Sequence, residues 1–156
     1  MKQKTFKNIA LLLILLSFGF SNCADKGKDT PKNIIIFIGD GMGVSQLYAA
    51  MTIHGQEFNI EKFPYAGLIK TYAADDYITE SAAAGTAIAT GIKTKNRMIG
   101  VKPDSSMVSS ITETANKNGL ASGAVSTSSI THATPAAFVA HNVARDNYCR
   151  KLQAIF

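Results

Sequence analysis

The hydrophobic positions of the chain form two patterns, short unbroken runs and runs spaced at helical intervals. Residues 33–38 are an Ile- and Phe-rich run that ends at Gly39, which is typical of a strand buried on both faces. Residues 66–72 and 121–127 are two further strand candidates. Residues 44–54, 81–91 and 106–118 have the spacing or composition of helices. This alternation predicts an α/β fold, a mostly parallel sheet with helices on both faces.

The first residues have the pattern of a bacterial export signal. Three lysines precede an apolar run that is shorter than the ~20 residues a helix needs to span a bilayer. A buried first strand or helix is the alternative. The segment Phe20-Ser21-Asn22-Cys23 resembles the processing site of bacterial lipoproteins. We therefore expect a lipoprotein-type signal peptide over 1–22, a lipid on Cys23 and a tether over 23–31. A cleaved, soluble periplasmic product remains the alternative.

Removal of the leader changes the charge of the protein. The chain has 16 basic and 11 acidic residues, and the leader contains three of the basic ones (Lys2, Lys4 and Lys7). The remaining 13 basic and 11 acidic residues give a net charge of +2. A charge this small is not the footprint of a nucleic-acid-binding domain. With Cys23 lipidated, Cys149 is the one thiol left, which excludes an internal disulfide. We expect one domain over residues 32–156.

Two residues stand where chemistry is expected in such a fold. Asp40 directly follows the first predicted strand, at the carboxyl end where α/β sheets bind ligands. A carboxylate there is a natural ligand for Zn²⁺ or Mg²⁺, although a turn aspartate that caps the next helix has the same spacing. Ser81 begins an alanine-rich helix whose free N–H groups attract anions. A metal could activate it as a nucleophile, and an ordinary N-cap serine is the alternative.

Thr134 and Arg145 extend this set of candidates. A threonine hydroxyl can ligate Mg²⁺, and a guanidinium matches phosphate oxygens with two parallel hydrogen bonds. Thr134 followed by Pro135 is also typical of a helix N-cap with proline at the first helical position. Arg145 could equally be a solvated surface charge. No member of the set decides the function alone.

Four segments of the chain together resemble the alkaline phosphatases. They are IGDGMG (38–43), TESAAAGTA (79–87), TGIKT (90–94) and HATPAAFVAHNVAR (132–145), in a match that runs from about residue 32 to 148. The resemblance implies two Zn²⁺ ions and one Mg²⁺, with Asp40 bridging a zinc and the magnesium site. It implies that Ser81 binds metal and forms a phosphoserine, that Thr134 ligates magnesium and that Arg145 grips phosphate. His132 would tune the third metal site.

The chain departs from the family's pattern in three respects. Glu80 stands where the family usually has Asp, and Arg97 stands where glycine is commoner. His54 and His141 match no ligand position, so we interpret them as structural. Most zinc ligands of the family come from the second half of its chains, and residues 149–156 no longer follow the pattern. We therefore expect the N-terminal half of the fold, truncated and inactive by itself.

The predicted function is metal-dependent hydrolysis of small phosphate monoesters through a phosphoserine. The location that the leader predicts is the bacterial cell envelope, facing the periplasm, with membrane contact through the lipid anchor only. No nucleic-acid partner is expected, and a full-length form could be a homodimer. One alternative is a non-catalytic envelope lipoprotein that retains a phosphatase-like half-fold. The others are a sister phosphodiesterase, which would tend to use threonine as nucleophile, and a sulfatase, which uses a different motif.

The lipid on Cys23 is directly testable. We predict that metabolic labelling with palmitate in a bacterial host marks the protein, and that Cys23→Ser abolishes the label because it removes the thiol that directly follows the leader. Cys149→Ser is the matched control and should keep the label. A freely soluble, unlabelled product would contradict the prediction.

Overall fold

The computed structural model describes residues 31–147, which belong to two compact units, 1–38 and 39–156. In the first unit, residues 31–38 form no helix or strand, and the side chains of Ile34 and Phe37 are 76% and 86% exposed. The strand predicted for residues 33–38 therefore has no ladder partner here. The leader, Cys23 and nearly all of the tether lie outside the described residues.

The second unit begins with a helix that the sequence predicts correctly. Helix α2 spans Val44–His54 and is preceded by Gly43, whose N–H donates to the Gln46 side chain at 3.1 Å. It ends at Gly55, which has a positive φ of 63° and donates its N–H to the Met51 carbonyl at 3.2 Å. Only glycine adopts this conformation without strain, so Gly55 terminates the helix as expected. A short 3₁₀ helix, η1 (Asn59–Lys62), follows.

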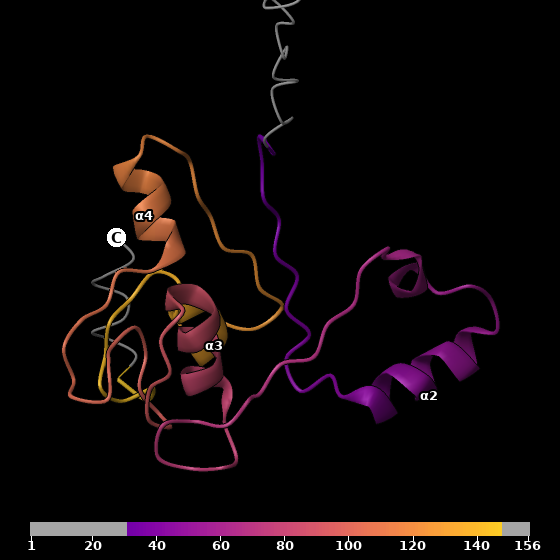
Figure 1. Ribbon diagram of the computed structural model, residues 1–156, viewed down its shortest axis with the longest axis horizontal. Helices are drawn as coiled ribbons and strands as arrows, with labels where there is room; N and C mark the ends of the chain where they lie inside the picture. The colour runs from indigo at the N-terminus through magenta and orange to yellow at the C-terminus, as the bar shows by residue number, and fades with distance from the viewer. Residues whose placement is uncertain (1–30, 148–156) are drawn as a thin grey trace, which may run out of the picture. The chain divides into compact units, whose positions relative to one another are not determined.

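Helix α3 (Ser81–Thr90) is the centre of the packed part of the second unit. It contacts α5 (Ala133–Ala136) and α4 (Ile111–Lys117), and Figure 1 shows the short turn of α5 directly behind α3. Small side chains allow this close approach. A Cβ added to Gly85 would lie 3.2 Å from the Ala137 Cβ and 3.4 Å from the Thr134 Cα. The small-residue composition of α3 therefore serves to bring α5 against it.

A small core surrounds this helix contact. Its cluster of buried apolar residues consists of Ala82, Ile99, Ala133, Ala136 and Ala137. Ile99 and Asn142 exchange two backbone hydrogen bonds of 2.8 and 2.7 Å, which tie the loop after α3 to the segment after α5. The next residue, Gly100, has a φ of 59°, and a Cβ there would lie 2.3 Å from the Ala140 carbonyl oxygen. Residue 100 must therefore be glycine for these two segments to meet.

Helix α4 is shorter than predicted. The sequence predicts a helix over 106–118, whereas the helix spans Ile111–Lys117 because Ser110 caps it. The Ser110 hydroxyl accepts from the Glu113 N–H at 3.2 Å, and the Glu113 carboxylate accepts from the Ser110 N–H at 3.1 Å. This reciprocal capping box sets the start of the helix.

His141 lies beside α4 and connects it to the core. Its ring nitrogens lie 2.5 Å from the Gly100 carbonyl oxygen and 2.6 Å from a Glu113 carboxylate oxygen. Partial burial tends to raise the pKa of Glu113, but the hydrogen bonds from His141 and the Ser110 N–H outweigh it and lower that pKa. These contacts agree with the structural role that the sequence suggested. His54, the other such histidine, packs edge-to-face on Phe58 with ring centroids 5.5 Å apart.

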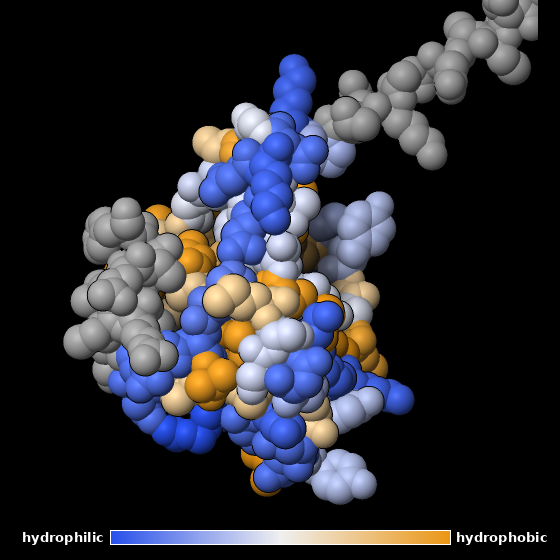
Figure 2. All heavy atoms as spheres, turned by 90° about the vertical axis from the view of Figure 1, so that its left-hand side faces the viewer, coloured by the Kyte–Doolittle hydropathy of each residue, from blue (hydrophilic) through white to orange (hydrophobic). Residues whose placement is uncertain are grey.

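The predicted parallel sheet is not formed by the described residues. Residues 66–72 and 121–127 contain no strand, and the only β pairings between residues 31 and 147 are the isolated bridges Ile99–Asn142 and Val101–Met107. Leu68, Ile69 and Val125 are consequently exposed. Figure 2 shows hydrophobic side chains interrupting the hydrophilic surface on the face it displays. A strand needs a neighbour to satisfy its backbone, and none of these segments has one. Among residues 31–147, no helix is both long and apolar enough to cross a membrane.

Candidate active site

Asp40 is presented by a tight turn. The Met42 N–H donates to the Gly39 carbonyl at 3.1 Å, which closes a four-residue turn with Asp40 and Gly41 at its centre. Gly41 has a φ of 71°, and this position of the turn favours glycine for that reason. A side chain at Gly39 would also collide with Met42, whose Cε would lie 2.5 Å away. The glycines on either side of Asp40 are thus required by the turn that exposes its carboxylate.

The Asp40 carboxylate joins two hydroxyl groups that are far apart in sequence. Its Oδ1 accepts a hydrogen bond from the Ser81 Oγ at 3.2 Å, and its Oδ2 accepts one from the Thr134 Oγ1 at 2.6 Å. The packing of α3 on α5 places these hydroxyls within reach of one carboxylate. Three of the predicted site residues therefore meet at one point.

Glu80 caps helix α3 immediately before Ser81. Its two carboxylate oxygens accept from the N–H groups of Ala82 and Ala83, each at 3.0 Å. Ser81 is consequently the first residue of the helix, and the reading of Ser81 as an ordinary N-cap does not hold. Because Glu80 satisfies the amides, Ser81 can turn its hydroxyl to Asp40.

The same carboxylate also binds Arg145. The Arg145 guanidinium donates to Glu80, and both side chains are partly buried. Burial tends to raise the pKa of Glu80, but the N–H groups of Ala82, Arg97 and Ala83, together with Arg145, lower it below its ordinary value of 4.5. Glu80 is therefore an anion at neutral pH, and it holds Arg145 beside the start of α3.

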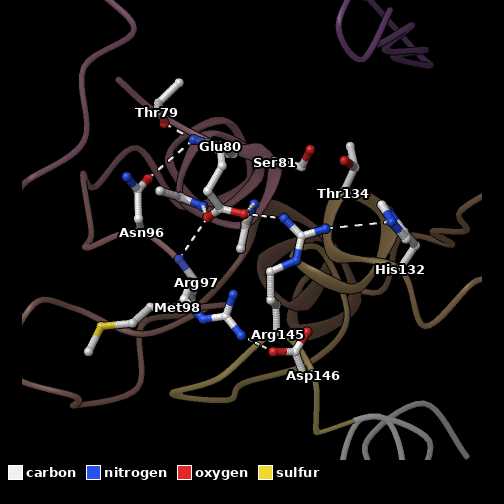
Figure 3. A network of polar contacts seen from close by, with 12 residues as sticks. Thr79, Glu80, Ser81, Asn96, Arg97, Met98, His132, Thr134, Arg145 and Asp146 are labelled. Atoms are coloured by element: carbon white, nitrogen blue, oxygen red, sulfur yellow. Dashed lines mark hydrogen bonds and ion pairs between the residues drawn. The ribbon is translucent and has the colours of Figure 1, made fainter. Parts of the chain in front are cut away.

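His132 lies on the other side of the same guanidinium. Its Nε2 lies 3.5 Å from the Arg145 Nη2, and because a guanidinium can only donate, the ring nitrogen must accept. Figure 3 shows Arg145 between Glu80 and His132, with Ser81 and Thr134 nearby. His132 is also the N-cap of α5. The prediction that Thr134 caps this helix is therefore wrong: Thr134 is the second residue of the helix, and its hydroxyl donates to Asp40.

Hydrogen bonds from the loop after α3 hold Glu80 in place. The Asn96 side chain accepts from the Glu80 N–H at 3.2 Å and donates to the Ile78 carbonyl at 2.8 Å. The Arg97 N–H donates to a Glu80 carboxylate oxygen at 2.7 Å. Sequence reasoning noted Arg97 only as a departure from a family pattern and missed Asn96. The hydrogen bonds from residues 16 and 17 positions away leave no local periodic signal.

The donor atoms at Asp40 fit a hard divalent cation in part. One carboxylate and two hydroxyls are the oxygen ligands that Mg²⁺ prefers. Within the part of the chain that the structure describes, however, no three His, Cys, Asp or Glu side chains gather to hold a metal ion. A zinc site takes three or four such ligands. The described residues thus supply oxygen atoms that suit Mg²⁺, but they do not supply the ligands of a zinc site.

The profile of one known family matches most of the sequence. The alkaline phosphatase profile matches residues 31–153. Among characterised relatives, alkaline phosphatase 4 of Bacillus subtilis (strain 168) is 46% identical over 129 residues, covering 77% of this chain and 28% of that protein. Alkaline phosphatase of Escherichia coli (strain K12) is 42% identical over 135 residues, covering 80% of this chain and 29% of that protein.

Solved structures of the same family resemble the fold. The alkaline phosphatase of the Antarctic bacterium TAB5 superposes with a TM-score of 0.79 at 44% identity, covering 81% of this chain and 37% of that one. Two variants of that enzyme, each with one histidine replaced and described with Mg bound in the M3 site, superpose equally well at 43% identity. The chain thus spans roughly a third of the length of the relatives it matches.

Glu80 should stabilise the protein in a pH-dependent way. We predict that Glu80→Ala lowers the free energy of unfolding by about 2 kcal/mol at about pH 7, because it removes the cap of α3 and leaves Arg145 without its carboxylate. The folded-state pKa is lowered, so this contribution is present above the unfolded-state value of 4.5 and is lost as the pH falls through the folded-state value. Urea unfolding at several pH values measures the difference.

The matched control is Glu57→Gln, which removes an exposed carboxylate that pairs with the exposed Lys62. It should change stability by less than about 0.5 kcal/mol at any pH. A Glu80→Ala deficit that stays constant from about pH 7 to about pH 3 would contradict the assignment.

Proposed function

Because this chain belongs to the alkaline phosphatase family, we propose that it carries the nucleophile, one metal-bridging carboxylate and the phosphate-binding arginine of a phosphomonoesterase. The observation that carries this proposal is the Asp40 carboxylate, which accepts from both the Ser81 and the Thr134 hydroxyl. Beside these hydroxyls, Glu80 holds the Arg145 guanidinium. This arrangement supports a site that combines a nucleophile, an anion-binding group and a cluster of oxygen ligands.

The reaction that these residues support is phosphoryl transfer through serine. Arg145 binds two non-bridging oxygens of the phosphate with parallel hydrogen bonds. The Ser81 oxygen attacks phosphorus and a new P–O bond forms to serine. The bond to the departing group breaks, and that group leaves as an alcohol with the proton that Ser81 releases. Asp40 orients the serine oxygen through their hydrogen bond. Water then hydrolyses the phosphoserine, which restores Ser81 and releases inorganic phosphate.

The metals of this proposal are two Zn²⁺ and one Mg²⁺. Asp40, Ser81 and Thr134 would hold the shared edge of the cluster, and His132 would face its magnesium side. When bound, the metals supply positive charge that lowers the pKa of a bound hydroxyl and stabilises the transition state. The Mg described in the TAB5 variants supports a magnesium site in this fold.

The proposed enzyme needs metal ligands and sheet strands beyond those that residues 31–147 supply. Among residues 31–147, Asp40 is the one carboxylate that hydrogen-bonds to Ser81 and Thr134, which is fewer ligands than a zinc ion takes. The exposed apolar segments at 33–38, 66–72 and 121–127 are the proposed strands of a parallel sheet, which further strands would complete. We therefore propose that the 156 residues alone have no useful phosphatase turnover. A full-length form would be lipid-anchored at Cys23 in the bacterial envelope and could pair as a homodimer.

The decisive experiment joins the chain to further sequence from a relative. The 156-residue chain is joined to the C-terminal remainder of the B. subtilis alkaline phosphatase 4, and turnover of an aryl phosphate is assayed at alkaline pH with Zn²⁺ and Mg²⁺. We predict turnover of about 1 per second or more in this chimera, and none in the 156-residue chain. Ser81→Ala should abolish turnover, and mass spectrometry at acid pH should find phosphate on Ser81.

Ser122→Ala, which removes an exposed serine that contacts Asn116, is the matched control and should retain full turnover. Phosphate on another residue would show that the nucleophile is misassigned. A folded, metal-loaded chimera without Ser81-dependent turnover would favour the non-catalytic lipoprotein instead.

A further inference from the structure

The side chain of Arg97 has a role that its backbone conformation does not explain. Arg97 has a φ of 73°, and Arg97 and Ser105 are the two non-glycine residues between 31 and 147 with a positive φ. Glycine would adopt this conformation without strain and would still present the N–H that donates to Glu80. What arginine adds at this position is therefore the guanidinium.

The Arg97 guanidinium pairs with Asp146, the residue that follows Arg145 in the chain. The Arg97 and Asp146 side chains are 60% and 57% exposed. The Asn147 N–H donates to the Ala144 carbonyl at 3.2 Å, so Arg145 and Asp146 occupy the centre of a tight turn. Figure 3 shows this pair beside the Glu80–Arg145 pair. The turn that carries Arg145 is thus tied to the loop that supports Glu80.

We propose that Arg97 is a positioning residue for Arg145. Its backbone N–H fixes the carboxylate that holds the Arg145 guanidinium, and its side chain fixes the turn from which Arg145 projects. The proposal rests on the proposed function in assigning phosphate binding to Arg145, but the positioning of Arg145 by Arg97 can be measured without turnover.

The size of the effect can be bounded. An exposed ion pair contributes little to overall stability, so loss of the Arg97 side chain should leave the fold intact. The same small energy is enough to change the order of one side chain several-fold. The expected signature is thus a local loosening of Arg145 with an unchanged unfolding transition.

The test measures the order of Arg145 directly in the full 156-residue chain. Hydrogen exchange of the Arg145 Nε–H is followed by NMR on arginine-labelled protein without phosphate. We expect Arg97→Gly to raise the exchange rate about two- to fivefold, the range that an exposed ion pair supports. Asp146→Asn should raise it equally, and the double variant should add nothing, because both changes remove one interaction. Arg97→Lys should restore a rate within about twofold of the original.

Lys95→Ala is the matched control, because it removes an exposed cation from the same loop and leaves the Arg97–Asp146 pair in place. An unchanged Arg145 exchange rate in both Arg97→Gly and Asp146→Asn would overturn the proposal, as would additive effects in the double variant. If Arg97→Gly raises the Arg145 exchange rate but the chimera shows no Ser81-dependent turnover, Arg97 positions Arg145 as proposed and the proposed function fails.

Discussion

The carboxylate of Glu80 is the constraint on which the arrangement of the site depends. It accepts two amide hydrogens at the start of α3, a third from Arg97, and the guanidinium of Arg145. A single anion thereby sets where the helix begins, where the following loop turns back and where the arginine points. Its negative charge is favourable because the helix amides and the guanidinium are positive. Removing this carboxylate would take away both the cap that sets the start of α3 at Ser81 and the partner that holds the Arg145 guanidinium.

Small side chains position Thr134, as Glu80 positions Arg145. Gly85 and Ala137 let α3 and α5 approach closely, and this contact brings the Thr134 hydroxyl within reach of the carboxylate that also binds Ser81. Asp40 then joins the two hydroxyls from an exposed turn. The alanine- and glycine-rich composition of α3 is therefore a packing requirement of the site as much as a helix preference.

Sequence reasoning succeeded where the signal is local. Gly55 and Gly91 end α2 and α3 as their positions predict, because a helix terminus is decided by neighbouring residues. It failed at residues 33–38, where an apolar run predicts a strand but the ladder partner must come from elsewhere in the fold. It also misplaced the cap of α5 on Thr134 instead of His132, because His132 is not a typical N-cap residue and makes no side-chain cap hydrogen bond. The support of Glu80 by Asn96 depends on a tertiary contact and has no pattern at all.

The central claim is that Asp40, Ser81 and Thr134 form one cation-binding edge. Paramagnetic Mn²⁺, which favours the same oxygen ligands as Mg²⁺, can be titrated into the ¹⁵N-labelled chain while amide signals are followed by NMR. We predict that the signals of Asp40, Ser81 and Thr134 broaden first and together, and that Asp40→Asn removes the effect. Broadening centred on the exposed Asp104 instead, or broadening at Ser81 and Thr134 that survives Asp40→Asn, would contradict the account.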